Sequence, residues 1–170
     1  MNLEDFSMAS FDVVNELDLQ ELDNTVNLVR KEADQRYDFK GSGTEIELNK
    51  KDKVLKIVTS DDMKVQAIKE MLVKHASKRG IDSRVFEFSE PENTSKGQRK
   101  FEVKANEGLG KDNAKKIVKM IKEMKLKVNP SIMDDRVRVE GKKLDELQQI
   151  IQMLKTSSMD VPVQFVNMKN

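Results

Sequence analysis

Apolar residues in the first half of the chain follow two different spacings. From Leu19 onward they recur at steps of three and four, which predicts a helix with one buried stripe. After the GSG turn at 41–43 the period falls to two, which is typical of strands that bury one face. The elements predicted here are, in order, a helix over 19–33, a hairpin over 45–59, a helix over 60–80 and a strand over 84–88.

The second half repeats this order of elements. Residues 90–98 are polar and contain proline and glycine, which predicts a linker. When the sequence is shifted by 82 positions, 52–72 aligns with 134–154 without a gap, and the apolar positions of a strand and a helix coincide. The elements predicted beyond the linker are a strand over 100–104, a helix over 111–125, a hairpin of 125–128 with 136–140, a helix over 142–156 and a last strand over 161–166.

With a strand before the first helix, each half has the order βαββαβ. This order predicts an α+β fold of two ferredoxin-like domains, each a four-stranded antiparallel sheet with two helices on one face. The other face of each sheet is left open to solvent or to a partner. Functional side chains are therefore sought first on that open face.

Charged residues are unevenly distributed along the chain, although the net charge is only +1. Residues 1–40 hold four basic and ten acidic side chains, whereas residues 96–129 hold eleven basic and four acidic ones. The asymmetry indicates either an anionic partner for the basic region or an acidic element that packs against it.

The composition excludes several kinds of site. The absence of cysteine excludes a disulfide framework, a thiolate zinc site and a cysteine nucleophile. The single histidine, His75, lies on the apolar stripe of its helix with no acidic partner predicted near it, so we expect a role in packing. No catalytic residue, metal site or cofactor is predicted. Apolar runs fall far short of the ~20 residues that span a bilayer, so we expect a cytoplasmic protein.

A glycine-containing segment, NEGLGKDNAKK at 106–116, follows a predicted strand and opens a helix. Its backbone N–H groups and lysines are a candidate phosphate cradle. The segment lacks the Walker A pattern, because Ala105 replaces the first glycine and Asp112 follows Lys111. An ordinary helix start with Asp112 as its cap is the favoured interpretation.

Basic side chains of the second half fall into two groups. One group lies on the predicted helix opposite its apolar stripe and is explained by contact with solvent. The other group lies on the open face of the predicted hairpin, with two side chains from each strand. Like charges on neighbouring strands repel, so this cluster predicts an anionic ligand, with phosphate as the leading candidate. The helix group is Lys115, Lys116, Lys119 and Lys122, and the hairpin group is Lys125, Lys127, Arg136 and Arg138.

Six segments of the chain together resemble a known family. They are ASFDVVNELDLQEL, RYDFKG, KRGID, KKIVKMIKEMKLKV, RVRVEGKKLDELQ and VPVQFVN. Over nearly all of its length from about Met8, the chain is similar to the YajQ family of bacterial nucleotide-binding proteins. The resemblance implies a cytoplasmic bacterial protein without catalytic activity, whose two ferredoxin-like domains exchange their N-terminal strands. It also implies binding of ATP, GTP or tRNA, or of cyclic di-GMP in cooperation with a transcription regulator.

The expected domain division follows from this resemblance. Strand exchange would bring the acidic Asp12 and Glu16 near the basic cluster of the hairpin and partly neutralise it. The predicted ranges are 8–89 for the first domain, 90–98 for the linker, 99–168 for the second domain, 10–16 for the strand in the second sheet, 100–104 for the strand in the first sheet and 1–7 for an extension.

The sequence thus predicts a non-enzymatic protein that binds a purine nucleotide, ATP or GTP, or cyclic di-GMP as a regulatory effector. One alternative is an RNA- or tRNA-binding protein that uses the basic sheet surface on phosphates, although the aromatic pattern of base-reading domains is missing from both central strands. Another is a protein-interaction adaptor of a transcription regulator. The candidate phosphate-binding residues are Lys125, Lys127, Arg136 and Arg138 from the hairpin, Lys116 and Lys119 from the helix, and Arg36 and Lys40 from RYDFK, where the resemblance is concentrated.

Overall fold

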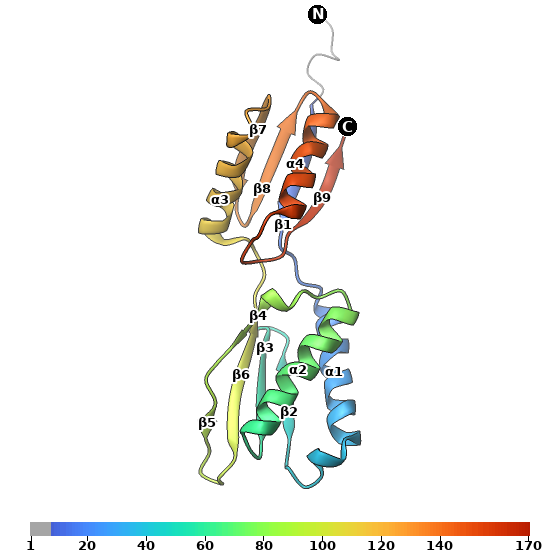
Figure 1. Ribbon diagram of the computed structural model, residues 1–170, viewed down its shortest axis with the longest axis vertical. Coiled ribbons are helices and arrows are strands. Elements are labelled where there is room, and N and C mark those ends of the chain that lie inside the picture. The colour runs from blue at the N-terminus through green and yellow to red at the C-terminus, as the bar shows by residue number, and fades with distance from the viewer. Residues whose placement is uncertain (1–7) are drawn as a thin grey trace, which may run out of the picture. The chain divides into compact units, whose positions relative to one another are not determined.

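The computed structural model describes residues 8–170 (Figure 1). The predicted extension at 1–7 lies outside the described residues. Within 8–170 the chain forms two antiparallel sheets and four α-helices, an α+β arrangement consistent with two ferredoxin-like domains. It divides into two compact units, a central unit of residues 17–106 and a terminal unit in which 107–170 join the N-terminal residues up to Glu16. No helix in this part of the chain is long and apolar enough to cross a membrane.

The central unit has two helices on one face of a sheet with the strand order β2-β3-β6-β4 (Figure 1). The short strand β5 also pairs with β6. Its elements are α1 (Leu19–Gln35), β2 (Glu45–Asn49), β3 (Val54–Thr59), α2 (Asp62–Lys78), β4 (Phe86–Phe88), β5 (Glu92–Asn93) and β6 (Arg99–Ala105), with 3-10 turns η2 (Tyr37–Phe39) and η3 (Ser83–Val85).

The terminal unit repeats this plan with the strand order β7-β8-β1-β9. Helices α3 and α4 cover one face of its sheet (Figure 1). Its elements are β1 (Ala9–Val14), α3 (Gly110–Glu123), β7 (Val128–Met133), β8 (Arg136–Gly141), α4 (Leu144–Thr156) and β9 (Gln164–Lys169).

One strand of each sheet comes from the opposite half of the sequence. Strand β1 lies between β8 and β9, with Phe11 opposite Val139 and Asp12 opposite Arg138. Strand β6 lies between β3 and β4, with Phe101 opposite Ile57. The strand that precedes α1 in the sequence is therefore hydrogen-bonded into the sheet of the terminal unit.

The helix starts follow from local sequence. Asp18 caps α1, because its Oδ1 accepts the N–H groups of Gln20 at 3.0 Å and Glu21 at 3.2 Å. Asp61 caps α2 in the same way, accepting from the N–H of Lys64 at 3.0 Å. These side chains satisfy backbone donors that the helices themselves leave free.

Each unit has its own apolar core between its helices and its sheet. The positions that coincide in the internal repeat are buried in both units, as the shared pattern predicts. They are Leu55, Ile57, Val65, Ile68 and Leu72 in the central unit and Val137, Val139, Leu147, Ile150 and Leu154 in the terminal unit.

The polar segment at 90–98 lies inside the central unit. Strand β5 pairs with β6, with Glu92 opposite Lys100 and Asn93 opposite Arg99. The N–H of Thr94 donates to the carbonyl of Gln98 at 2.8 Å, which closes the turn between them. The proline, glycine and polar residues that predict a linker thus belong to an exposed hairpin.

Candidate functional site

The two arginines predicted to bind phosphate contact a carboxylate of the chain itself. Because β1 lies beside β8, Asp12 stands opposite Arg138 on the open face of the terminal sheet. Arg138 Nε donates to Asp12 Oδ1 at 2.9 Å, and Arg136 Nη1 donates to Oδ2 at 3.0 Å. Asn167 Nδ2 donates to the same Oδ2 at 2.8 Å. Asp12 is only 1% exposed, so this anion is buried beneath its donors.

These contacts change the charge state of the cluster. The Arg138 guanidinium, with Asn167 and Arg136, holds the pKa of the Asp12 carboxyl well below its usual range, although burial opposes the shift. Arg136 Nη2 also lies 3.4 Å from Glu16 Oε1. Asp12 and Glu16 therefore offset the charge of the two arginines.

The prediction that Lys125 and Lys127 share a strand face with these arginines is wrong. Strand β7 begins only at Val128, and the residues opposite Arg136 and Arg138 are Met133 and Ser131. Lys125 has a left-handed φ of 57° just after α3, where the chain leaves the helix. Alternation in KLKV resembled a strand, but these residues form the turn that leads into one.

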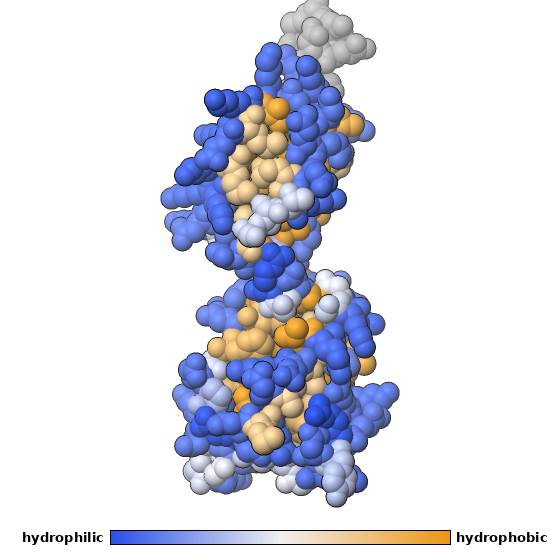
Figure 2. Space-filling view, viewed as in Figure 1, coloured by the Kyte–Doolittle hydropathy of each residue, from blue (hydrophilic) through white to orange (hydrophobic). Residues whose placement is uncertain are grey.

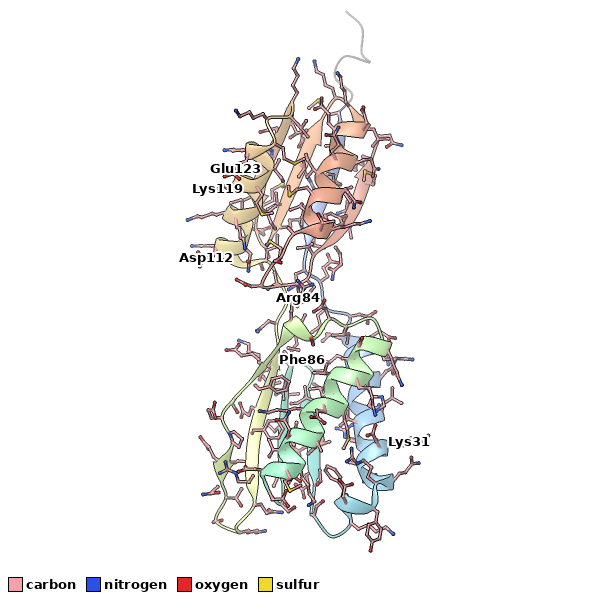
Figure 3. All side chains as sticks on the ribbon, viewed as in Figure 1. Lys31, Arg84, Phe86, Asp112, Lys119 and Glu123 are labelled. Atoms are coloured by element: carbon pink, nitrogen blue, oxygen red, sulfur yellow. The ribbon has the colours of Figure 1, made fainter. Side chains whose placement is uncertain are left out.

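Four lysines instead surround a hollow between α3 and β7. The hollow has a volume of about 480 Å³, and we call it the lysine groove. Three of its lysines recur on one side of α3 at steps of four and three, so the helix brings them together. In Figure 3, Lys119 and Glu123 project from the same side of this helix. The residues that line the groove are Lys115, Val118, Lys119, Lys122, Glu123, Lys125 and Ile132.

The lysine groove combines free positive charge with an apolar wall. In the described part of the chain, none of its four ammonium groups forms an ion pair. Val118 packs against the core, and Ile132 is 47% exposed although it is aliphatic. On the face shown in Figure 2, the outer side of α3 is hydrophilic and apolar side chains gather between α3 and α4.

In the glycine-containing loop before α3, two backbone N–H groups already have partners within the fold. The N–H of Gly108 donates to the carbonyl of Asn15 at 2.7 Å, and the N–H of Leu109 donates to that of Asp135 at 3.1 Å. Gly108 has φ +87°, and a Cβ there would lie 3.0 Å from Asp135 Cγ. The prediction that Asp112 caps the helix is also wrong, because α3 begins at Gly110 and Asp112 lies inside its first turn.

The remaining predicted residues lie apart from the lysine groove. Lys116 Nζ lies 3.4 Å from the carbonyl of Ser158, so this lysine is directed to a different side of α3 from Lys119. In the central unit, Arg36 donates twice to Asp38, at 3.0 and 2.9 Å, and this contact raises the pKa of the arginine. Lys40 Nζ lies 5.4 Å from the centroid of the Tyr37 ring.

Of the predicted residues, Lys119 and Lys125 therefore line one hollow. Sequence reasoning missed Lys115, Lys122 and Ile132 as parts of the same hollow. The signal was present in the spacing of the helix lysines, but a helical pattern alone does not show which neighbouring strand passes beside it.

A second hollow of about 480 Å³ lies on the open face of the central sheet. It has the wrong charge for phosphate, because glutamates outnumber lysines in its lining. The glutamates are Glu45, Glu47, Glu90, Glu92 and Glu102, and the lysines are Lys56 and Lys100.

His75 has an acidic partner that was not predicted. Its Nε2 lies 2.8 Å from Glu32 Oε1, and Lys74 Nζ lies 2.6 Å from the same oxygen. Lys74 and His75 lower the pKa of the Glu32 carboxyl. The pair forms because α1 packs on α2, which sequence spacing did not show. Within residues 8–170 there is no group of three histidine or acidic side chains that could hold a metal ion.

A family model and several related proteins match nearly the same, almost complete stretch of the chain. A family model described as "Nucleotide-binding protein YajQ-like" matches residues 9–169. A "Nucleotide-binding protein" of Nitratidesulfovibrio vulgaris (strain DSM 19637 / Miyazaki F) is 54% identical over 162 residues, which cover 95% of this chain and 99% of the relative. Proteins with the same description from Oleidesulfovibrio alaskensis and Cytophaga hutchinsonii are 49% and 43% identical, over 96% and 95% of this chain and 100% of each relative.

Proposed function

The chain belongs to the YajQ-like family of nucleotide-binding proteins, and from this premise we propose that it binds a purine nucleotide, ATP or GTP, or cyclic di-GMP. The nucleotide acts as a regulatory effector, and its phosphates bind in the lysine groove. One observation carries this proposal: four lysines without ion-pair partners in the described chain surround one hollow that also has an apolar wall.

The charge of the groove favours an anionic ligand. Four ammonium groups face one carboxylate, Glu123, so the lining has a net charge of +3. Like charges held on one helix side repel each other, and a bound phosphate relieves that repulsion. The arginines of the open face differ in this respect, because Asp12 already binds both.

The lining of the groove also suits a nucleotide. The groove is shallow and wide open to solvent, so a nucleotide would lie across it rather than inside a closed cavity. Val118 and Ile132 provide apolar contact for a ribose or a base beside the lysines. The lining offers charge and apolar contact without a hydroxyl, thiol or imidazole, which supports a binding role rather than a catalytic one.

The same proposal includes exchange of the N-terminal strands between two ferredoxin-like domains. Pairing of β1 with β8 and β9, and of β6 with β3 and β4, supports it. The exchange matters for function because β1 carries Asp12, which accepts hydrogen bonds from Arg136 and Arg138 of the terminal sheet. Phosphate is thereby directed to the helix side of the unit.

RNA is the second candidate ligand. Lys115, Lys119 and Lys122 form a row along α3 that a strand of linked phosphates could follow. Such binding would weaken steeply with salt, with a log–log slope of about 0.7–0.9 per phosphate contact. A tRNA affinity that rises above that of mononucleotides and shows this slope would favour RNA.

Isothermal titration of the full chain with ATP, GTP and cyclic di-GMP tests the proposal. The variant K115Q/K119Q/K122Q is expected to lose about tenfold or more in nucleotide affinity, because each lysine–phosphate contact is charge-assisted. The control K142Q/K143Q/K155Q removes the same charge from exposed lysines outside the groove and should bind as the wild type does. Equal affinity of both variants would reject the lysine groove as the site.

A further inference from the structure

The lysine groove has a composition that distinguishes two forms of the same nucleotide. On the premise of the proposed function, which puts phosphates in this groove, we infer that it takes the magnesium-free polyphosphate and disfavours the Mg²⁺ complex. The ligand of highest affinity is then a nucleoside triphosphate without bound metal. This preference concerns the charge of the ligand, and it can be tested separately from nucleotide binding itself.

The first argument is a count of charges. A terminal phosphate carries about −1.5 to −2 and each further phosphate about −1, so a free triphosphate carries about −4 at neutral pH. Bound Mg²⁺ cancels about half of that charge. The groove supplies four ammonium groups against the single carboxylate of Glu123. The attraction therefore decreases strongly when the metal is bound.

The second argument concerns ligand atoms. Magnesium bridges oxygens of the terminal phosphates, which are the same oxygens that lysine ammonium groups contact. Protein sites for Mg²⁺ complexes usually add one or two carboxylates that approach the ion. In the groove the one carboxylate is Glu123, at a helical step of four from Lys119. Four ammonium groups surround this single carboxylate and repel the metal ion, so on balance the lining favours the bare phosphates.

The third argument is the spacing of the lysines. Lys115, Lys119 and Lys122 are separated along the helix axis by about 6 Å and about 4.5 Å. Adjacent phosphates of one polyphosphate chain can contact several of these groups together. The two phosphates of a cyclic dinucleotide carry one charge each and are separated by sugars. We therefore expect triphosphate to bind more tightly than diphosphate, and diphosphate more tightly than cyclic dinucleotide.

Titration of the full chain with ATP tests this inference, once with EDTA and once with excess Mg²⁺, at ionic strength matched with NaCl. The expected result is an affinity about tenfold weaker in Mg²⁺. Inorganic tripolyphosphate should displace ATP in the EDTA sample, whereas adenosine should not. The variant Glu123→Gln should tighten binding of metal-free ATP by about threefold and widen the ratio between the two conditions.

The outcomes separate this inference from the function on which it rests. ATP binding that is equal or tighter in Mg²⁺ overturns the inference and leaves nucleotide binding intact. If ATP, GTP and cyclic di-GMP all fail to bind in both conditions, the inference and the proposed function are both overturned. A third outcome would also overturn the inference: ATP binds in EDTA, and the ratio of its affinities without and with Mg²⁺ is the same in K115Q/K119Q/K122Q as in the wild type. The discrimination would then lie outside the lysine groove.

Discussion

Asp12 is the residue whose surroundings most constrain the terminal unit. Its carboxylate is 1% exposed and accepts hydrogen bonds from Arg136, Arg138 and Asn167. Such a group is stable in a buried position only while its donors remain, and the donors in turn depend on it. The cluster joins β1 to β8 and to β9, so one side chain connects three strands.

Asp12→Asn is expected to lower the free energy of unfolding by about 2 kcal/mol. Removal of the charge leaves two arginines without their anion, but both are about one-third exposed, so solvent compensates part of the loss. Urea unfolding measures the difference. Asp160→Asn, at an exposed position of the same unit, is the control and should change stability little. Equal stability of the two variants would contradict a stabilising role for the cluster.

The same substitution should change how stability depends on pH. The pKa of Asp12 is lower in the folded protein than its ordinary value, so in acid the unfolded chain takes up a proton that the folded chain does not. The stability contributed by the cluster is therefore complete above about pH 4 and lost as the pH falls further. The difference between wild type and Asp12→Asn should shrink over that acidic range and stay constant between about pH 6 and 8.

The proposed function depends on helix α3 and strand β7, which together line the lysine groove. Helix α3 presents lysines at steps of four and three, and β7 presents Ile132 beside them. Nearby like charges on a helix lower its stability, so repulsion among Lys115, Lys119 and Lys122 destabilises α3 in the free protein. A bound phosphate would relieve that repulsion.

Lys119→Glu is expected to change affinity and stability in opposite directions. The new carboxylate would attract Lys115 and Lys122 and repel Glu123, for a net gain of about 0.5 kcal/mol in the free protein. Nucleotide affinity should fall by about tenfold or more, because a cation becomes an anion in the groove. Thermal unfolding and isothermal titration measure the two effects. Lys116→Glu reverses a charge on the same helix outside the groove and should keep its affinity.

At this scale the sequence predicted every α-helix of the described chain, but it began β7 and β9 three residues too early and did not predict β5. The error in β7 is the one that affects the site. The hydrophobic period of α3 ends near Met124, and the alternation of Leu126 and Val128 suggested that the strand began at once. The chain first makes a left-handed turn at Lys125, and β7 then includes Pro130, which has no N–H for a ladder. This shift separates the lysines from the arginines.

At the scale of the whole molecule, one folding pattern occurs twice with different surfaces. The repeat fixes the buried positions in both units, because each needs the same stripes to cover its sheet. The exposed positions are free to differ: the central unit has a glutamate-rich hollow on its open face, and the terminal unit has the lysine groove on its helix side. The proposed binding site therefore belongs to one copy of the repeat only.

The fold was more predictable than the site, because apolar spacing reveals buried positions but does not reveal which charged side chains lack partners. Apolar periodicity reports which positions are buried, and the spacing of apolar residues alone identified the core of both units. A binding site depends on which side chains remain without partners, and that follows from contacts between distant segments. Arg136 and Arg138 have their partner 124 and 126 residues away in Asp12, whereas Lys115 and Lys122 have none within the described residues.

Amide spectra of the ¹⁵N-labelled full chain, recorded as metal-free ATP is added, locate the ligand most directly. Binding in the lysine groove predicts saturable shifts concentrated at Val118 to Lys125 and at Ile132, with small changes elsewhere. The variant K115Q/K119Q/K122Q should remove those shifts. Saturable shifts concentrated around Arg36 and Lys40, or around Arg138, would contradict the proposed site.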